Sequence, residues 1–121
     1  MKALLSLAVL ALAAVPVHAA CTYPKAPSAI PDGATATLAD MVAAQKSVKE
    51  FDQEINEYTN CIKLEEDAQL KGDKLTDDQK KAIQAQQAMK NNAAVDADQT
   101  LADRLNEQIR IFKAKQAANK G

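Results

Sequence analysis

Apolar side chains recur at alternating spacings of three and four residues over positions 41–62. The stripe consists of Met41, Ala44, Val48, Phe51, Ile55, Tyr58 and Ile62. This heptad spacing places them on one face of an α-helix and is typical of a coiled-coil seam. No proline or glycine interrupts the chain between Gly33 and Gly72, and Gly72 is a favourable C-terminal stop, so the pattern predicts one long helix over about residues 37–71.

Capping sequences mark the start of this helix and of a second one. Thr37 begins a capping box in which Asp40 takes the place of the usual Glu or Gln, and Thr76 begins another with Gln79. The second helix is predicted over about residues 77–117, after a short loop. A short loop between two long helices makes an antiparallel hairpin. The predicted fold class is therefore all-α, a long and coiled-coil-like helical hairpin.

The apolar stripe of the second helix is poorer than that of the first. It falls into two parts, first Ala82, Ala85 and Met89, and then Leu101, Leu105, Ile109 and Phe112. Between the two parts lie Asn91 and Asn92, which have low helix propensity. We therefore expect a kink or a break at these two residues.

Residues 20–36 have a different character from the two helical segments. The prolines of this segment are Pro24, Pro27 and Pro31. Proline fixes φ and lacks an N–H, so the segment is predicted to be an extended arm that ends in a turn at Asp32 and Gly33. Two helices alone bury little apolar surface. Either this arm supplies a third layer, or two hairpins pair into a four-helix bundle; the helical hairpin itself occupies residues 37–121.

The first 19 residues have the pattern of a secretory signal peptide. Lys2 supplies the positive charge, and residues 3–15 are apolar apart from Ser6, a run too short to span a bilayer. The alternative is an N-terminal anchor that is retained. Export places the mature protein in the periplasm or outside the cell.

Small side chains at Val17 and Ala19 place the predicted cleavage after Ala19. Cleavage after Ala20 would put His18 three residues before the cut, a position that it fits less well. A further interpretation is a lipoprotein with Cys21 as its first mature residue, although the bacterial lipobox has an apolar residue where His18 stands.

Loss of residues 1–19 changes the chemistry of the chain. It removes Lys2 and His18, the only histidine, and leaves 14 basic and 16 acidic residues, a net charge of −2. Such a nearly neutral chain has no electrostatic footprint for nucleic acid or anionic membrane. No later stretch is apolar enough to cross a membrane. The remaining chain of about 102 residues is enough for one domain.

The mature chain retains two cysteines, Cys21 and Cys61, and an even count in an exported chain indicates a disulfide. Cys61 lies about 36 Å along the first helix from Thr37, at 1.5 Å per residue. The extended arm can reach about 50 Å, so it can double back along the helix and meet Cys61. Intermolecular pairing and a free thiol are the alternatives.

This chain lacks the residues that most enzyme mechanisms require. Without a mature histidine, the usual general base and the commonest zinc ligand are absent, and no Ser-His-Asp arrangement can be built. The remaining acidic groups are Asp77 with Asp78, Asp96 with Asp98, and Glu65 with Glu66 and Asp67. A thin hairpin offers no cleft between two carboxylates, so these acids are interpreted as helix caps and solvated faces. We expect no catalytic, cofactor or metal site.

Two resemblances to known proteins are present. Leu75-Thr76-Asp77-Asp78-Gln79 resembles the L-T-x-x-Q motif of Spy-like periplasmic chaperones, which are small exported all-helical proteins that cradle unfolded clients as dimers. The motif covers five residues and occurs once, whereas many members carry it twice. A hydrophobic staple with a capping box would give the same five residues.

The second resemblance covers the arm and the first helix. It is carried by Cys21-Thr22-Tyr23-Pro24, by residues 30–36 (IPDGATA), by residues 41–45 (MVAAQ) and by Tyr58-Thr59-Asn60-Cys61. These segments are similar to a group of uncharacterised small exported proteins of Gram-negative bacteria. The resemblance implies an exported helical protein and carries no activity.

The sequence thus predicts a non-enzymatic exported protein that binds a protein partner or itself in the cell envelope. The predicted interaction seam consists of Met41, Val48, Phe51, Ile55, Tyr58 and Ile62. One alternative is a Spy-like chaperone, for which Met41 and Met89 would offer an adaptable surface. Others are a small envelope lipoprotein and an enzyme or metal binder that uses carboxylates.

Overall fold

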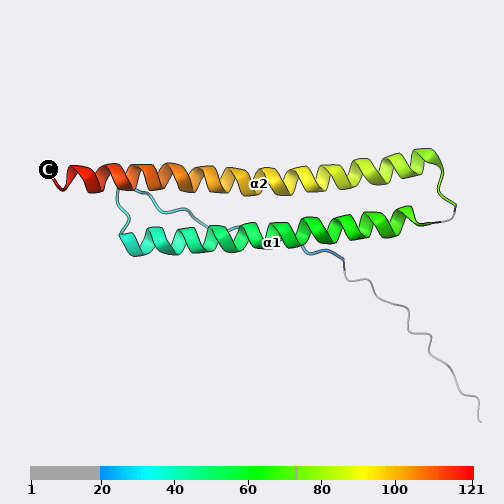
Figure 1. The fold of residues 1–121 in the computed structure, drawn as a ribbon, viewed down its shortest axis with the longest axis horizontal. Helices are drawn as coiled ribbons and strands as arrows, with labels where there is room; N and C mark the ends of the chain where they lie inside the picture. The colour runs from blue at the N-terminus through cyan, green and yellow to red at the C-terminus, as the bar shows by residue number, and fades with distance from the viewer. Residues whose placement is uncertain (1–19, 73) are drawn as a thin grey trace, which may run out of the picture.

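The computed structural model describes residues 20–72 and 74–121, which form two helices packed side by side in an antiparallel hairpin (Figure 1). Helix α1 spans Leu38–Leu70 and helix α2 spans Asp77–Ala118. The all-α hairpin predicted from the sequence is confirmed. The predicted signal peptide and its cleavage position after Ala19 lie outside the described residues.

Both helices begin at the predicted capping boxes. The Thr37 hydroxyl accepts from the Asp40 N–H at 3.2 Å, and the Asp40 carboxylate accepts from the Thr37 N–H at 2.9 Å. Thr76 and Gln79 exchange the same two hydrogen bonds at 3.2 and 2.9 Å. Hydrogen bonds from the Thr37 hydroxyl and backbone hold the pKa of Asp40 below its usual value. Each box therefore satisfies donors that a helix start would otherwise leave unpaired.

Helix α2 runs without a break through Asn91 and Asn92, so the kink predicted there is wrong. Low propensity costs less than about 1 kcal/mol per residue, and tertiary packing overrides a penalty of that size. Ala94, two residues after Asn92, is fully buried at 0% exposure and packs this part of the helix into the core.

The predicted stripe of α2 is correct only in its second part. Leu101, Leu105 and Phe112 are buried and Ile109 is half-buried, whereas Ala82, Ala85 and Met89 are exposed, Met89 by 73%. The inward row of this part of the helix consists instead of half-buried Ile83 and buried Gln87 and Ala94. The apolar pattern did not predict this row, because the polar residue Gln87 occupies a core position in it.

The hydrophobic core lies in the part of the hairpin that is remote from the loop. One cluster of buried residues joins the turn before α1 to both helices: Ala36, Met41, Ala44, Val48, Phe51, Ile55, Ala94, Leu101, Leu105 and Phe112. We call residues 20–61 and 94–118 the arm half, and residues 62–93 the loop half. All members of the cluster belong to the arm half. Ile62 and Gln87 are buried in the loop half, outside the cluster.

The arm forms a third layer on the arm half. It runs back along α1 and reaches the C-terminal part of α2 before the chain turns into α1 (Figure 1). Ile30 packs against the core cluster, as does Tyr58 of α1. Of the two ways in which the sequence could complete the core, the structure uses the arm.

The turn at the end of the arm docks onto α2 through Gly33. This glycine is buried, and its N–H donates to the side-chain carbonyl of Gln108 at 2.8 Å. A Cβ at Gly33 would overlap the backbone carbonyl of Gln108 and lie 2.9 Å from the Phe112 nitrogen. The Lys115 ammonium adds a 3.3 Å hydrogen bond to the Ala36 carbonyl. Glycine is required here because the backbone of the turn approaches the backbone of α2 too closely for any side chain.

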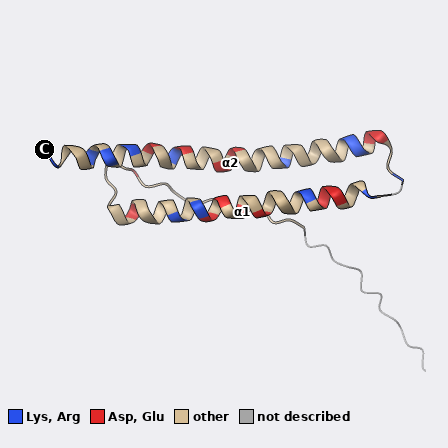
Figure 2. Cartoon of the chain, in the orientation of Figure 1, with Lys and Arg blue, Asp and Glu red and all other residues tan. Residues whose placement is uncertain are grey.

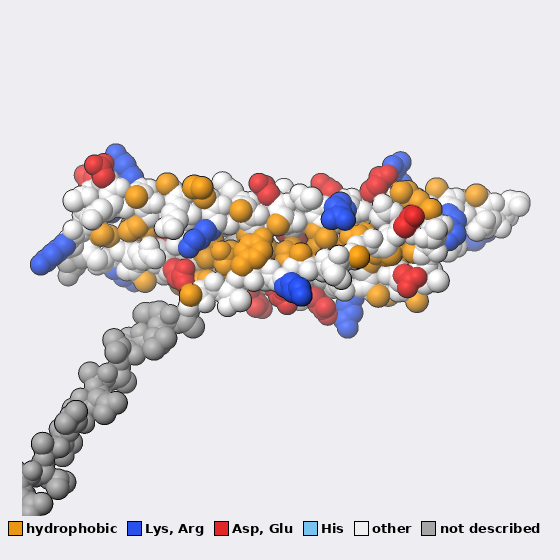
Figure 3. Space-filling view, turned by 180° about the vertical axis from the view of Figure 1, so that it is seen from behind, with side chains coloured by type: hydrophobic (Ala, Val, Ile, Leu, Met, Phe, Trp, Pro, Cys, Tyr) orange, Lys and Arg blue, Asp and Glu red, His pale blue; other side chains and the backbone are white. Residues whose placement is uncertain are grey.

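Charged side chains are spread over the surface of the hairpin (Figure 2), and several large apolar side chains are exposed among them. Acidic and basic residues are interspersed along both helices (Figure 2). Hydrophobic side chains gather along the line between the helices (Figure 3). In the part of the chain that the structure describes, neither helix is long and apolar enough to cross a membrane.

Candidate functional site

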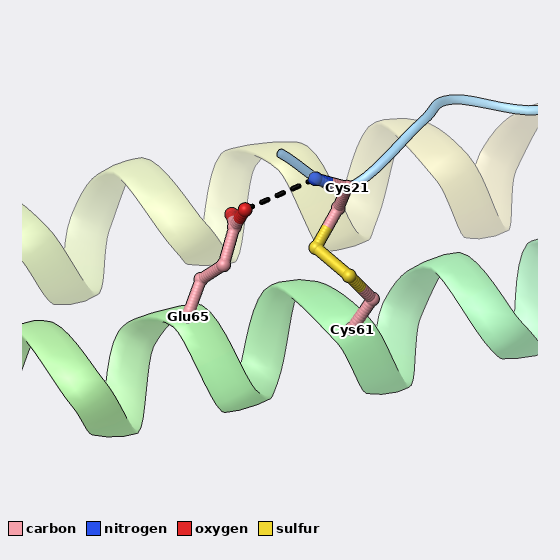
Figure 4. Close-up of side chains that lie close together, drawn as sticks. All are labelled: Cys21, Cys61 and Glu65. Atoms are coloured by element: carbon pink, nitrogen blue, oxygen red, sulfur yellow. Dashed lines mark hydrogen bonds between the residues drawn. A yellow bond between two sulfur atoms is a disulfide. The ribbon is translucent and has the colours of Figure 1, made fainter. Parts of the chain in front are cut away.

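A disulfide ties the start of the arm to the middle of α1. Cys21 and Cys61 are 40 residues apart in sequence, and the bridge brings their Cα atoms to 5.8 Å (Figure 4). The Cys21 N–H also donates to the Glu65 carboxylate, one turn further along α1, at 3.0 Å. The structure thus has the predicted intramolecular bridge, which uses both cysteines of the chain.

The bridge removes the reactive chemistry that the two thiols would offer. The ligand atoms of Cys21, Cys61 and Glu65 all lie within 4.8 Å of one another, an arrangement that a metal ion could in principle share. Thiolates are the species that bind zinc, and both sulfurs are bonded to each other here. A sulfur in a disulfide is equally unable to carry a lipid, so this structure does not accommodate a lipoprotein anchored through Cys21.

An aromatic pair holds the arm next to the bridge. The rings of Tyr23 and Tyr58 meet edge to face, with centroids 5.1 Å apart and planes at 74°. This is a favourable geometry for two aromatic rings because the positive edge of one meets the negative face of the other. The arm is therefore fastened at three places along its length, namely the disulfide, the tyrosine pair and the docked Gly33 turn.

The predicted interaction seam is occupied within the chain itself. Met41, Val48, Phe51, Ile55 and Ile62 are buried, and Tyr58 is half-buried against Tyr23. Helix α2 and the arm cover these side chains. A partner of the folded chain would therefore need a different surface.

Asp67, Asp77, Asp78 and Asp96 are exposed, as helix caps and solvated faces are, whereas Glu65, Glu66 and Asp98 are half-buried. Of these three, Asp98 lies on α2 opposite Asp52 of α1. Burial raises its pKa, and hydrogen bonding to and charge repulsion from Asp52 on the facing helix raise it further. The Oδ1 atom of Asp98 is buried without a hydrogen-bond partner. The sequence position of Asp98 could have indicated this environment, because it lies one turn from both Ala94 and Leu101, in the inward row of α2.

Gln87 is the second buried polar group that lacks a partner. Its side chain is in the loop half and only 4% of the residue is exposed, yet its Oε1 atom accepts no hydrogen bond. It lines a hollow of about 370 Å³ between the helices. Polar side chains of both helices surround this hollow, among them Thr59, Lys63 and Glu66 of α1 and Gln84 and Asn91 of α2. Sequence reasoning missed Gln87, since a polar residue interrupts an apolar stripe.

No family model matches the chain, and no curated protein and no solved structure matches it. The residues of the hairpin are therefore the basis for any functional argument.

Proposed function

We propose that this chain is a non-enzymatic exported helical protein that binds a protein partner in the cell envelope. The observation that carries the proposal is the asymmetry of the hairpin. The arm lies over one face, and the other face presents a polar hollow that the unpartnered Gln87 lines. Buried polar atoms are costly when unpaired, so a surface that leaves one unpaired is a natural place for a partner.

Export is supported by the disulfide and by the predicted signal peptide at residues 1–19. Disulfides form and persist in oxidising compartments, which include the periplasm and the exterior of the cell. The intact mass of the protein recovered from the periplasm tests this part of the proposal. A mass that retains residues 1–19 would contradict cleavage after Ala19.

Binding is favoured over catalysis by the groups that the hairpin brings together. The raised pKa of Asp98 comes from its position between packed helices next to Asp52, and both cysteine sulfurs are consumed by the bridge. The Spy-like alternative receives no specific support, because Thr76 and Gln79 of its motif are engaged in the capping box of α2. An aggregation assay with an unfolded client, in which this protein gives no protection, would separate the two proposals.

Site-specific photocrosslinking in cells tests the proposed function. A photoreactive residue replaces Asn56, which is exposed on α1 in the same helical row as Thr59 and Lys63. The matched control replaces Met89, which is also exposed but belongs to a different face of α2. We expect a discrete adduct, identified by mass spectrometry, at position 56 and none at position 89. Absence of a discrete adduct from position 56 would refute the proposal.

A further inference from the structure

The hairpin has two long faces, of which the arm covers one. On α1 the arm lies over the row that contains Ser47, Glu54 and Tyr58, since these residues line hollows together with arm residues. The neighbouring row of α1 follows the same alternation of three and four residues: Leu38, Val42, Gln45, Lys49, Asp52, Asn56, Thr59, Lys63 and Glu66. We call this row, with the α2 row that contains Gln87, Asn91, Val95 and Asp98, the arm-free face.

The α2 side of the arm-free face contains both unpartnered atoms. Within the described residues, Gln87 Oε1 and Asp98 Oδ1 are the two buried side-chain atoms without a hydrogen-bond partner. They lie eleven residues apart on α2, which is about three helical turns, so they point to the same side of the helix. Asp98 faces Asp52 and Gln87 lines the hollow with Thr59, which places both on the arm-free face.

We propose that a second copy of this chain packs on the arm-free face, so that two hairpins form a four-helix bundle. This inference rests on the proposed function and names the partner. The first argument for a second copy is that the face complements itself. The hollow contains one cation, Lys63, one carboxylate, Glu66, and several amides. In a two-fold interface the same patch meets itself, so Lys63 of one copy can pair with Glu66 of the other, and the amides can both donate and accept.

The second argument is the area of the face compared with what a dimer requires. At 1.5 Å per residue and about 10 Å of width per helix, the 33 residues of α1 lying beside the longer α2 give a face of about 1,000 Å². A stable interface needs about 800 Å² from each partner. Three of the exposed large hydrophobic side chains belong to this face: Leu38, Val42 and Val95. The arm-free face is therefore large enough, and it supplies apolar contacts on the side of the polar hollow that is remote from the loop.

Analytical ultracentrifugation of the processed protein over about 1 to 500 µM tests the inference. The disruptive variant is Val95→Glu, since Val95 lies between Asn91 and Asp98 in the row and is 36% exposed. The matched control is Met89→Glu, which adds the same charge elsewhere on α2. We expect wild type and Met89→Glu to dimerise alike, and Val95→Glu to dimerise at least tenfold more weakly with an unchanged helical circular dichroism signal.

A second variant keeps the test valid if Val95→Glu fails to fold. Val42→Glu places the charge on the α1 row at a residue that is 55% exposed, and it should weaken dimerisation in the same way. A wild-type protein that stays monomeric up to 500 µM overturns the second copy as the partner. The second copy is also overturned as the partner if Val95→Glu or Val42→Glu dimerises as strongly as wild type. Either result leaves the proposed function standing if position 56 still crosslinks to a different protein, whereas the absence of every adduct would overturn both.

Discussion

The arm half and the loop half of the hairpin consist of the same two helices but are held together differently. Ten buried residues form one cluster in the arm half, which the arm covers as a third layer. In the loop half, Ile62 and Gln87 are the buried residues, and Gln87 has an unpaired oxygen. Continuous helix therefore does not imply uniform stability. Amide hydrogen exchange should show the loop half opening at lower free energy than the arm half.

The largest expected effect is loss of the bridge, which acts on the arm half. The disulfide closes a loop of 40 residues, for which the chain-entropy model gives about 4 kcal/mol. Cys61→Ser should lower the free energy of unfolding by up to about that amount and release residues 20–36, while most helix content remains. Urea melts and hydrogen exchange measure the two effects. Arm amides that stay equally protected would show instead that Tyr23, Ile30 and the Gly33 turn hold the arm without the bridge.

The next effect compares truncation of one buried side chain in each half. Phe51→Ala should destabilise the protein by about 4 kcal/mol, because Phe51 is 2% exposed and belongs to the buried cluster. Ile62→Ala should cost about 2 kcal/mol, at the low end for buried residues, because the sparser loop half can close around the cavity. Met89→Ala is the exposed control, at no more than about 0.5 kcal/mol. Equal losses for Phe51 and Ile62 in urea melts would mean that the two halves are packed equally well.

The same substitution at two glycines, one in each half, compares how the two halves tolerate an added Cβ. Gly33→Ala should destabilise the protein by about 2 kcal/mol, since the added Cβ overlaps the backbone of Gln108 and the turn must lift off α2. Gly72→Ala is the matched control. A Cβ added at Gly72 would lie 3.4 Å from its nearest neighbour, the Gln69 carbonyl oxygen, which is an ordinary contact distance. Its effect should stay within about 0.5 kcal/mol. A tolerated Gly33→Ala in thermal melts would contradict the tight docking of the turn.

The smallest effect is the pH dependence contributed by Asp98. Its pKa in the folded state is raised, so the folded protein holds this proton more tightly than the unfolded chain. By linkage, stability falls as the pH rises through the raised pKa, and the penalty is absent below the unfolded pKa. Asp98→Asn should therefore stabilise the protein at neutral pH by less than about 1 kcal/mol, and the gain should vanish in acid. Urea melts of wild type and Asp98→Asn run from pH 3 to pH 7 measure this difference, and a gain that persists unchanged in acid would contradict the raised pKa.

The helix starts could be predicted because neighbouring residues encode them, Thr37 with Asp40 and Thr76 with Gln79. The bridge joins distant residues, but the chain contains two cysteines, Cys21 and Cys61, and the arm is long enough to bring them together. The features that the sequence did not predict depend on how α1, α2 and the arm contact one another. Neither the burial of Gln87 nor the docking of Gly33 against Gln108 has a local signal.

The order in which contacts become possible follows from the antiparallel arrangement. Residues that meet near the loop are close in sequence, whereas the contacts from Gly33 to Gln108 and from Lys115 to Ala36 join positions 75 and 79 residues apart. Helix pairing that starts at the loop buries little apolar surface, because the apolar cluster lies in the half remote from the loop. We therefore expect slower folding than in a hairpin whose core begins at its loop. A long chain segment must be closed, at a cost in conformational entropy, before the apolar cluster can form. Both cysteines precede α2 in the chain, so a protein that emerges N-terminus first can form its covalent bridge before the helix that completes its core exists.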